Sequence, residues 1–162
     1  MERYTVRVTK DYFVFCAAHF ISYEKTQCER LHGHNYRVAA EIEGPLDENS
    51  LVIDFIEVKR VLRLITDELD HRVLLPRNNP VLALEENGHD VTVRFGDRKS
   101  WVFPHEDCVI LDIENTTAEL LAFWVSGRLL DEIEAKGFPR PERVSVEVEE
   151  TTGQSAIYEQ RF

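Results

Sequence analysis

Three histidines near the N-terminus have the types and spacing that a metal site needs. His32 and His34 are two residues apart in the segment CERLHGHNY, so on a strand they project from one face, about 6.5–7 Å apart. Two imidazoles at that separation can converge on one ion, and Gly33 between them leaves room for a neighbouring backbone. His19, within the apolar run FCAAHF, offers a third imidazole from a preceding strand. Three nitrogen ligands with an open fourth position are typical of catalytic zinc.

An HxH pair alone is common in proteins that bind no metal, and His19 is what favours the metal interpretation, because a buried imidazole needs a partner or a ligand role. Cys28 precedes His32 by four residues. A nearby zinc ion would lower the pKa of this thiol and make a thiolate available as base or nucleophile. Cys28 could instead be a fourth ligand that closes a structural site. Cys16 and Cys108 lie in apolar runs and are expected to be inert core thiols.

The composition limits the class of protein. With 162 residues, 43% apolar and 30% charged, the chain is expected to form one domain over residues 1–162. A net charge of −11 argues against general nucleic-acid binding. Neither a membrane-spanning run nor a signal-peptide pattern is expected, and the three cysteines cannot all pair, which favours a reducing cytoplasm.

Periodicity places these residues on a small set of elements. Period-two patterns predict strands over residues 3–9, 36–43 and 143–150, and the apolar run at 13–20 continues the first of them in extended form. Helical patterns begin at Asp54, with Glu57 completing a capping box, and at Thr116 or Thr117, ending at Gly137. Residues 81–113 add a hairpin, VTVRF and SWVF, and a further strand at 107–113. This order predicts an α+β fold, with helices on one face of a mainly antiparallel sheet.

The ordered motifs AAH, C-x3-HGHNY, VIDF, LDH, T-x-E and ET resemble the 6-pyruvoyl-tetrahydropterin synthase family over nearly the whole chain, apart from 81–113. The resemblance implies a tunnelling fold, an antiparallel four-stranded sheet with two helices on one face, here with an inserted hairpin region at 81–113. It also implies a homohexamer, a dimer of trimers, with active sites between subunits. Its zinc ligands fall on His19, His32 and His34, and its catalytic cysteine falls on Cys28.

The same resemblance assigns two further parts of the site. Its catalytic Asp-His pair falls on Asp70 and His71, although a polar helix end would also explain these residues. Its pterin-anchoring glutamate falls on Glu150, which shares the inward parity of Val144, Val146 and Val148; an inward carboxylate needs donors such as a pterin edge. Thr117 matches the T-x-E motif and is expected to border the pterin ring as well as to cap a helix.

Three residues between Cys28 and His32 resemble the 6-carboxy-tetrahydropterin synthases of queuosine biosynthesis, whereas five would resemble the animal pyruvoyl enzymes. The expected activity is that of a zinc-dependent lyase that converts dihydroneopterin triphosphate to 6-carboxytetrahydropterin, acetaldehyde and triphosphate. Glu29 leaves an alternative open, because a glutamate at this place resembles a subgroup that makes 6-hydroxymethyl-dihydropterin for folate. A solvated loop acid explains Glu29 somewhat better than a catalytic role does. The 6-pyruvoyl-tetrahydropterin synthase activity is a further alternative.

Two other classes of function compete with a pterin lyase: a hydrolase using metal-bound hydroxide, and a non-catalytic binder of a pterin or purine. The proton-transfer set of Cys28, Asp70 and His71 argues against the binder, and Glu150 argues against a generic hydrolase. The triphosphate of the substrate needs cations on this acidic chain. The candidates are basic residues near the motifs, Lys25, Arg30, Arg72 and Arg77. His89 and His105 are expected to be surface or loop histidines.

Overall fold

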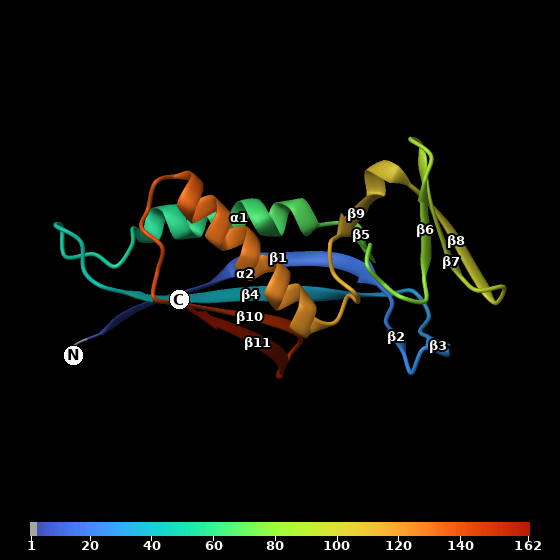
Figure 1. Cartoon of the computed structure of the whole chain (residues 1–162), viewed down its shortest axis with the longest axis horizontal. Helices are drawn as coiled ribbons and strands as arrows, with labels where there is room; N and C mark the ends of the chain where they lie inside the picture. The colour runs from blue at the N-terminus through green and yellow to red at the C-terminus, as the bar shows by residue number, and fades with distance from the viewer. Residues whose placement is uncertain (1–2) are drawn as a thin grey trace.

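Two long neighbouring strands form the centre of the computed structural model, which describes residues 3–162. They belong to a six-stranded sheet of order β11-β10-β4-β1-β5-β9, and two helices cover one face of it (Figure 1). The bounds are β1 Tyr4–His19, β4 His32–Gly44, β5 Arg72–Pro76, β9 Cys108–Leu111, β10 Arg143–Thr151, β11 Gln154–Arg161, α1 Phe55–Leu69 and α2 Ala118–Ala135. The predicted α+β class and the two helices are therefore confirmed.

The expectation of a four-stranded sheet is wrong. Strands β11, β10, β4 and β1 are antiparallel as expected, but β5 adds parallel to β1, and β9 adds parallel to β5. Leu74 of β5 packs in the main core and Leu75 packs in a second core on the other side. Because β5 is buried on both faces, it has no period-two pattern that would reveal it in the sequence.

A bulge in β1 decides which way His19 points. Val8 faces the main core, and the register with β4 then shifts between Thr9 and Val14. After this shift, odd-numbered positions such as Phe13 and Phe15 face the core. Between the Thr9 and Val14 pairs β1 has three more residues than β4, and an odd number of extra residues reverses the alternation of the side chains. His19 thereby lies fully buried on the helix-covered face of the sheet.

Both helices begin at the predicted caps. The Asp54 carboxylate accepts a hydrogen bond from the Ile56 amide, and the Thr117 hydroxyl accepts one from the Leu120 amide. The predicted capping box at Glu57 is wrong, because this carboxylate binds Arg60 and Lys136, at 3.1 and 3.0 Å. It therefore ties α1 to the end of α2 instead of to its own first turn.

The inserted region is more than a hairpin. The predicted pair is present as β7 Asp90–Phe95 and β8 Lys99–Pro104, and a third strand, β6 Ala83–Glu86, joins it in a separate sheet beside the main one (Figure 1). A short 3-10 helix, η1 His105–Asp107, leads into β9. The second core, under this sheet, consists of Phe20, Leu75, Leu82, Val91, Val93 and Phe95. Phe20 directly follows His19, so the inserted sheet packs against the neighbourhood of the histidines.

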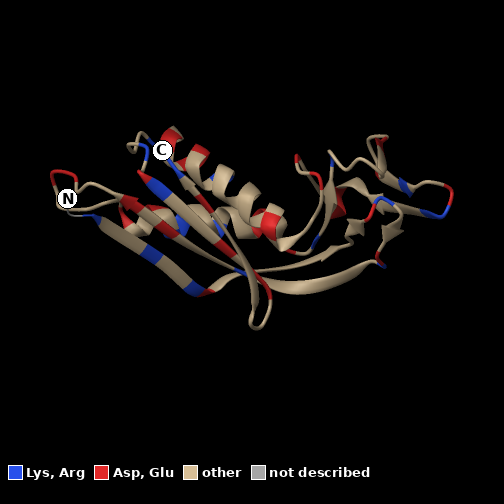
Figure 2. Cartoon of the chain, turned by 60° about the horizontal axis from the view of Figure 1, so that its bottom comes forward, with Lys and Arg blue, Asp and Glu red and all other residues tan. Residues whose placement is uncertain are grey.

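The face of the main sheet without helices carries paired charges (Figure 2). Arg143 is almost buried there and donates to Glu43, Glu41 and Glu159, at 2.9, 3.1 and 3.0 Å. These contacts hold the pKa of Glu43 below its ordinary value, chiefly through the hydrogen bond from Arg143. Among residues 3–162, the helices all fall short of the length and apolarity that crossing a bilayer requires.

Candidate metal centre

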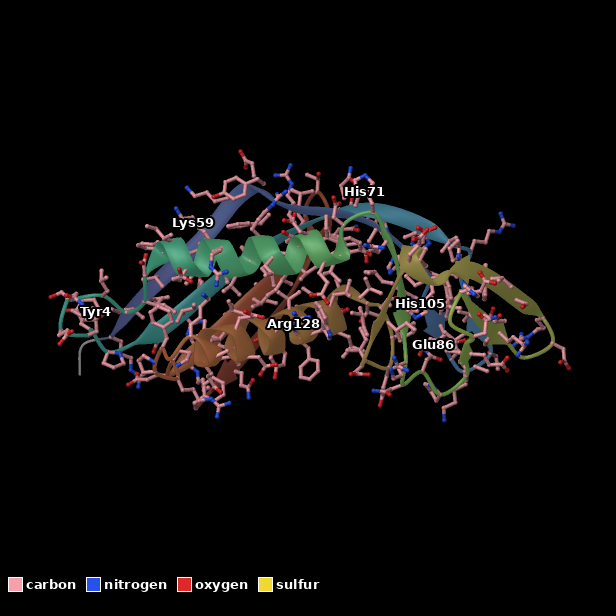
Figure 3. All side chains as sticks on the ribbon, turned by 90° about the horizontal axis from the view of Figure 1, so that it is seen from above. Tyr4, Lys59, His71, Glu86, His105 and Arg128 are labelled. Carbon is pink, nitrogen blue, oxygen red and sulfur yellow. The ribbon has the colours of Figure 1, made fainter. Side chains whose placement is uncertain are left out.

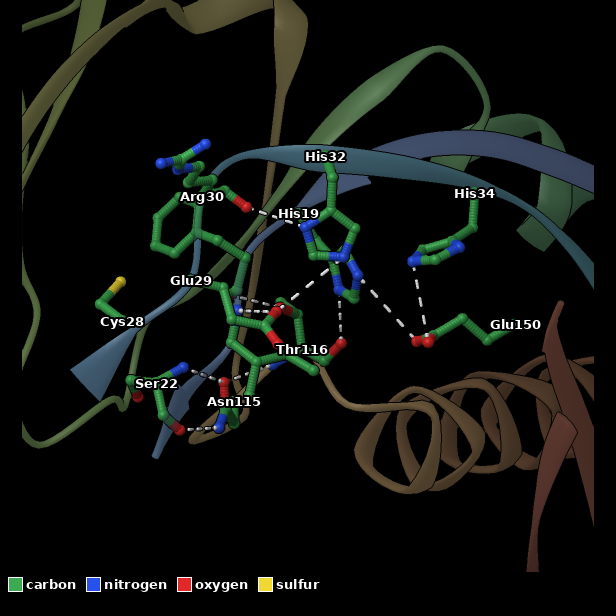
Figure 4. Close-up of polar contacts among 12 residues, drawn as sticks. His19, Ser22, Cys28, Glu29, Arg30, His32, His34, Asn115, Thr116 and Glu150 are labelled. Carbon is green, nitrogen blue, oxygen red and sulfur yellow. Dashed lines mark hydrogen bonds and ion pairs between the residues drawn. The ribbon is translucent and has the colours of Figure 1, made fainter. Parts of the chain in front are cut away.

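The three predicted histidines meet at one end of the sheet, on the helix-covered face. His19 and His32 are direct register partners across β1 and β4, and His34 lies two residues further along β4. One ring nitrogen from each lies within 4.8 Å of the others, so the set could hold a metal ion (Figure 4). The β1 bulge and the β1–β4 register together create this cluster.

Backbone carbonyls fix two of the three rings. His19 Nδ1 donates to the carbonyl of Thr116 at 2.8 Å, and His32 Nδ1 donates to the carbonyl of Arg30 at 2.8 Å. A hydrogen bond at Nδ1 leaves Nε2 unprotonated and directed at the cluster, as in many metal-binding histidines. Burial lowers the pKa of His19 to about 4, although the Thr116 carbonyl opposes the shift. His19 is therefore neutral near pH 7, as a metal ligand must be.

His34 supplies the observation that tests the fit of a metal. Its Nε2 atom is buried and has no hydrogen-bond partner among the described residues. An unpartnered buried polar atom costs about 1–3 kcal/mol, so such atoms are rare in folded proteins. A metal ion shared with His19 and His32 would satisfy it. The donor set, three imidazoles and no thiolate, fits a zinc ion with an open fourth position.

Two carboxylates flank the histidines (Figure 4). Glu150 places Oε1 3.7 Å from His34 Nε2 and Oε2 4.0 Å from His19 Nε2. Glu29 places Oε2 3.9 Å from His32 Nε2. Both side chains are partly exposed, Glu29 at 38% and Glu150 at 24%.

Cys28 lies on the other side of Glu29 from the histidines (Figure 4). Its half-buried side chain packs against the second core. Burial is the largest effect on this thiol and raises its pKa; Lys99 and Arg98 lower it in part, while Glu29 raises it further. In this conformation the group that faces the histidines is therefore the Glu29 carboxylate, and the thiol is directed elsewhere.

Asp70 and His71 lie apart from the histidine cluster. Asp70 Oδ2 accepts from His71 Nδ1 at 2.8 Å, and Asp70 Oδ1 accepts from the Cys16 amide at 2.7 Å. Burial disfavours ionisation of Asp70, but these two hydrogen bonds outweigh it and lower its pKa. The His71 side chain is 81% exposed at the end of α1 (Figure 3). Within the described part of one chain, no hydrogen bond or ion pair joins His71 to the cluster.

Cys16, Cys108 and Arg77 lie in three different environments in the structure. The expectation that Cys16 is a core thiol is wrong, because its side chain alternates with buried Phe15 and Ala17 and is exposed. Burial and the Asp107 charge raise the pKa of half-buried Cys108 to about 11, which agrees with an inert thiol. Arg77 is held by Glu86 and Asp112, at 3.0 and 3.2 Å.

The remaining basic candidates have no ion-pair partner among the residues that the structure describes. Lys25 and Arg30 are exposed, and Arg72 is half-buried on β5. His89 and His105 are exposed, as expected, and His105 Nε2 lies 3.1 Å from a Glu86 carboxylate oxygen in the inserted region (Figure 3).

Three residues that contribute to the site are not predicted from the sequence. Thr116 acts through its carbonyl, and any residue type could provide that group. Tyr36 is fully buried with its hydroxyl 3.2 Å from His19 Nε2, and burial raises its pKa. Its inward parity on β4, shared with His32 and His34, is a signal that could have identified it. Lys99 contacts the Cys28–Glu29 backbone from the inserted region, across about 70 residues of sequence.

Gly33 is required by the close approach of β1. A Cβ atom at this position would lie 3.1 Å from the Ala17 carbonyl oxygen. Gly33→Ala is expected to lower the free energy of unfolding by about 1–3 kcal/mol and to weaken metal binding, because the strand carrying His32 and His34 must shift. Thermal unfolding and metal titration measure the two effects.

Gly127→Ala in α2 is the matched control, because a Cβ there meets nothing within 4 Å. Alanine also favours helix over glycine by about 1 kcal/mol, so this variant should be as stable as the parent chain or more so. Equal stability of the Gly33→Ala variant and the parent chain would contradict the tight β1–β4 approach.

Comparison with known proteins agrees with this geometry. A sequence model of the 6-pyruvoyl tetrahydropterin synthase family matches residues 7–161. A Methanocaldococcus jannaschii protein, provisionally named 6-carboxy-5,6,7,8-tetrahydropterin synthase, is 32% identical over 145 residues, 89% of this chain and 88% of its own length. The Aquifex aeolicus protein of that name is 31% identical over 112 residues, 68% of this chain and 62% of the relative. The structure of Plasmodium vivax 6-pyruvoyltetrahydropterin synthase is 29% identical, with a TM-score of 0.91 over 100% of both chains.

Proposed function

Because this chain belongs to the 6-pyruvoyl tetrahydropterin synthase family, we propose that it is a zinc-dependent lyase acting on 7,8-dihydroneopterin triphosphate. The proposed products are 6-carboxy-5,6,7,8-tetrahydropterin, acetaldehyde and triphosphate, as in queuosine and other 7-deazapurine biosynthesis. The names of the archaeal and Aquifex relatives support this product. The observation that carries the proposal is the cluster of three histidines flanked by the carboxylates of Glu29 and Glu150.

The ligands of the ion are proposed to be the Nε2 atoms of His19, His32 and His34. The orientation of the rings supports this set, and so does His34 Nε2, which has no hydrogen-bond partner within residues 3–162. When bound, zinc would act as a Lewis acid that acidifies the hydroxyl groups of the substrate side chain. The residues of the chain would hold the pterin in place and move protons next to that ion.

Glu150 is proposed to anchor the pterin ring. Its carboxylate reaches toward the cluster from the helix-covered face, and the amino-pyrimidinone edge of a pterin offers two donors in a fork. Thr117 stands at the start of α2, directly after the Thr116 carbonyl that orients His19. A ring bound by Glu150 would therefore lie near both the ion and the N-terminus of α2.

Cys28, Asp70 and His71 are proposed as proton-transfer groups. The contact between Asp70 and His71 supports the pairing, because a carboxylate at Nδ1 orients an imidazole and stabilises its charged form. Since His71 lies apart from the cluster of its own chain, the proposal places it in the site of a second copy. A homohexamer with sites between subunits would satisfy this requirement.

A second product is favoured by Glu29. This carboxylate, and not the Cys28 thiol, faces the histidines, as a general base acting beside the ion would. Variant structures of the Plasmodium vivax relative replace a glutamate that is described as a catalytic residue. A chain that uses Glu29 in this way would form 6-hydroxymethyl-dihydropterin, so we propose Cys28 for the carboxy product and Glu29 for the hydroxymethyl product.

The test is incubation of zinc-loaded protein with dihydroneopterin triphosphate, with the products identified by mass. Acetaldehyde and the 6-carboxy product are expected as the main products, with the hydroxymethyl product as the second. Recovery of unchanged substrate from protein with one zinc per chain would refute both activities. A hydroxymethyl product alone would reject the leading one.

A further inference from the structure

The turn between β7 and β8 holds the segment that carries Cys28 and Glu29. Arg98 Nη1 donates to the carbonyl of Thr26 at 2.8 Å. The ammonium group of Lys99 donates to the carbonyl of Glu29 at 2.9 Å and to that of Cys28. Two neighbouring cations of the inserted sheet therefore bind three carbonyls within residues 26–29, near the basic tip of that sheet (Figure 2).

Few hydrogen bonds other than those from Arg98 and Lys99 hold residues 26–29. The Glu29 amide donates to the Ile21 carbonyl at 2.9 Å, and the Ile21 amide donates to Glu29 Oε2 at 3.4 Å. Strands β2 Ser22–Tyr23 and β3 Gln27–Cys28 contain two residues each. The turn between them holds Glu24 and Lys25 at φ 51° and 56°, in the left-handed region that non-glycine residues rarely adopt. Charge-assisted hydrogen bonds are about twice as strong as neutral ones, so the Lys99 ammonium is a major restraint on this backbone.

Lys99 is itself held in place. It is half-buried, and its ammonium lies 5.9 Å from the centre of the Trp101 ring. Trp101 stacks on Phe20 with ring centres 4.4 Å apart and planes 12° from parallel. Since Phe20 directly follows His19, the last residue of β1, Lys99 is fixed to the same strand end as the histidine cluster.

Strand β3 ends at Cys28, and the side chains of Cys28 and Glu29 point to different places. Glu29 reaches His32, and Cys28 packs against the second core. A half-turn of the segment would exchange them, and the two carbonyls that Lys99 binds would turn away with it. Fixing these carbonyls therefore fixes which of the two side chains faces the histidines.

We propose that Lys99 is a positioning residue that, through the carbonyls of Cys28 and Glu29, holds Glu29 toward the histidine cluster and Cys28 away from it. In the two-product activity on which this inference rests, Lys99 sets the balance between the products. Loss of Lys99 favours the carboxy product, because the segment is then free to present Cys28.

The experiment compares Lys99→Met with Lys99→Arg in the full zinc-loaded chain. Methionine keeps the apolar stem but cannot donate, whereas arginine restores donors to both carbonyls. Lys99→Met is expected to lower kcat for the hydroxymethyl product about 10-fold, with KM within about twofold, and to raise the ratio of carboxy to hydroxymethyl product. Lys99→Arg should restore most of the parent ratio. Lys59→Met, at a half-buried lysine on α1, is the control and should change neither quantity (Figure 3).

Hydrogen exchange of the metal-free chain gives a readout that does not depend on activity. Peptides covering residues 26–31 should exchange about 10-fold faster in Lys99→Met, and those covering α1 should not change. Exchange at 26–31 equal to that of the parent chain would overturn the inference even if no pterin product is ever found. An unchanged product ratio in Lys99→Met, or one that Lys99→Arg does not restore, would also overturn it. Absence of both products from the parent chain would instead count against the proposed function.

Discussion

His34→Ala is expected to abolish metal binding and to lower turnover at least about 10³-fold, because the remaining two imidazoles cannot hold zinc at an open site. The variant should nevertheless fold. In the metal-free chain His34 Nε2 is buried and has no hydrogen-bond partner among residues 3–162, so its removal relieves an uncompensated polar group. Zinc should raise the thermal midpoint of the parent chain and leave that of the variant unchanged.

Zinc content by elemental analysis and the thermal midpoint with and without zinc measure this prediction. His105→Ala is the control, because His105 is an exposed histidine of the inserted region whose ring contacts Glu86. This variant should retain one zinc per chain and full turnover. A His34→Ala protein that still carries one zinc per chain would show that His34 is not a ligand.

The second large effect is expected at the neighbouring pair Cys28 and Glu29. Cys28→Ser should lower the rate of the carboxy product about 10²-fold or more, because a hydroxyl is a far weaker proton-transfer group than a thiol. Glu29→Gln should lower the hydroxymethyl product by a similar factor, because the amide keeps the shape but not the basicity of the carboxylate. Each variant should leave the other product within a few-fold of the parent level.

Product ratios by mass spectrometry decide between this division and a single shared base. If Glu29→Gln removes both products and Cys28→Ser removes neither, then Glu29 alone moves the protons and the role proposed for Cys28 is wrong. Glu150→Gln provides a comparison within the same site. It should raise KM for both products together, because a pterin anchor serves either reaction.

The sequence predicted the parts of the site that follow from local periodicity. Two histidines separated by one glycine on a period-two strand must share a face, and this is why His32 and His34 were readable as a pair. The helix caps at Asp54 and Thr117 were readable for the same local reason. His19 was harder, because its direction depends on a bulge whose position only the β1–β4 register reveals.

Long-range packing accounts for what the sequence did not reveal. Strand β5 joins the sheet through a parallel partner distant in sequence and is buried on both faces, so its pattern resembles no half-buried strand. The exposure of Cys16 follows from the same bulge that turns His19 inward. The contact of Lys99 with the Cys28–Glu29 backbone depends on a second core that assembles around Phe20, and no local pattern encodes it.

X-ray absorption at the zinc edge of the loaded parent chain tests whether three imidazoles hold a metal ion with an open position between Glu29 and Glu150. Three nitrogen neighbours are expected at about 2.0–2.1 Å, with any further neighbour an oxygen. A sulfur neighbour at about 2.3 Å would make Cys28 a fourth ligand of a closed structural site and would refute the proposed open site.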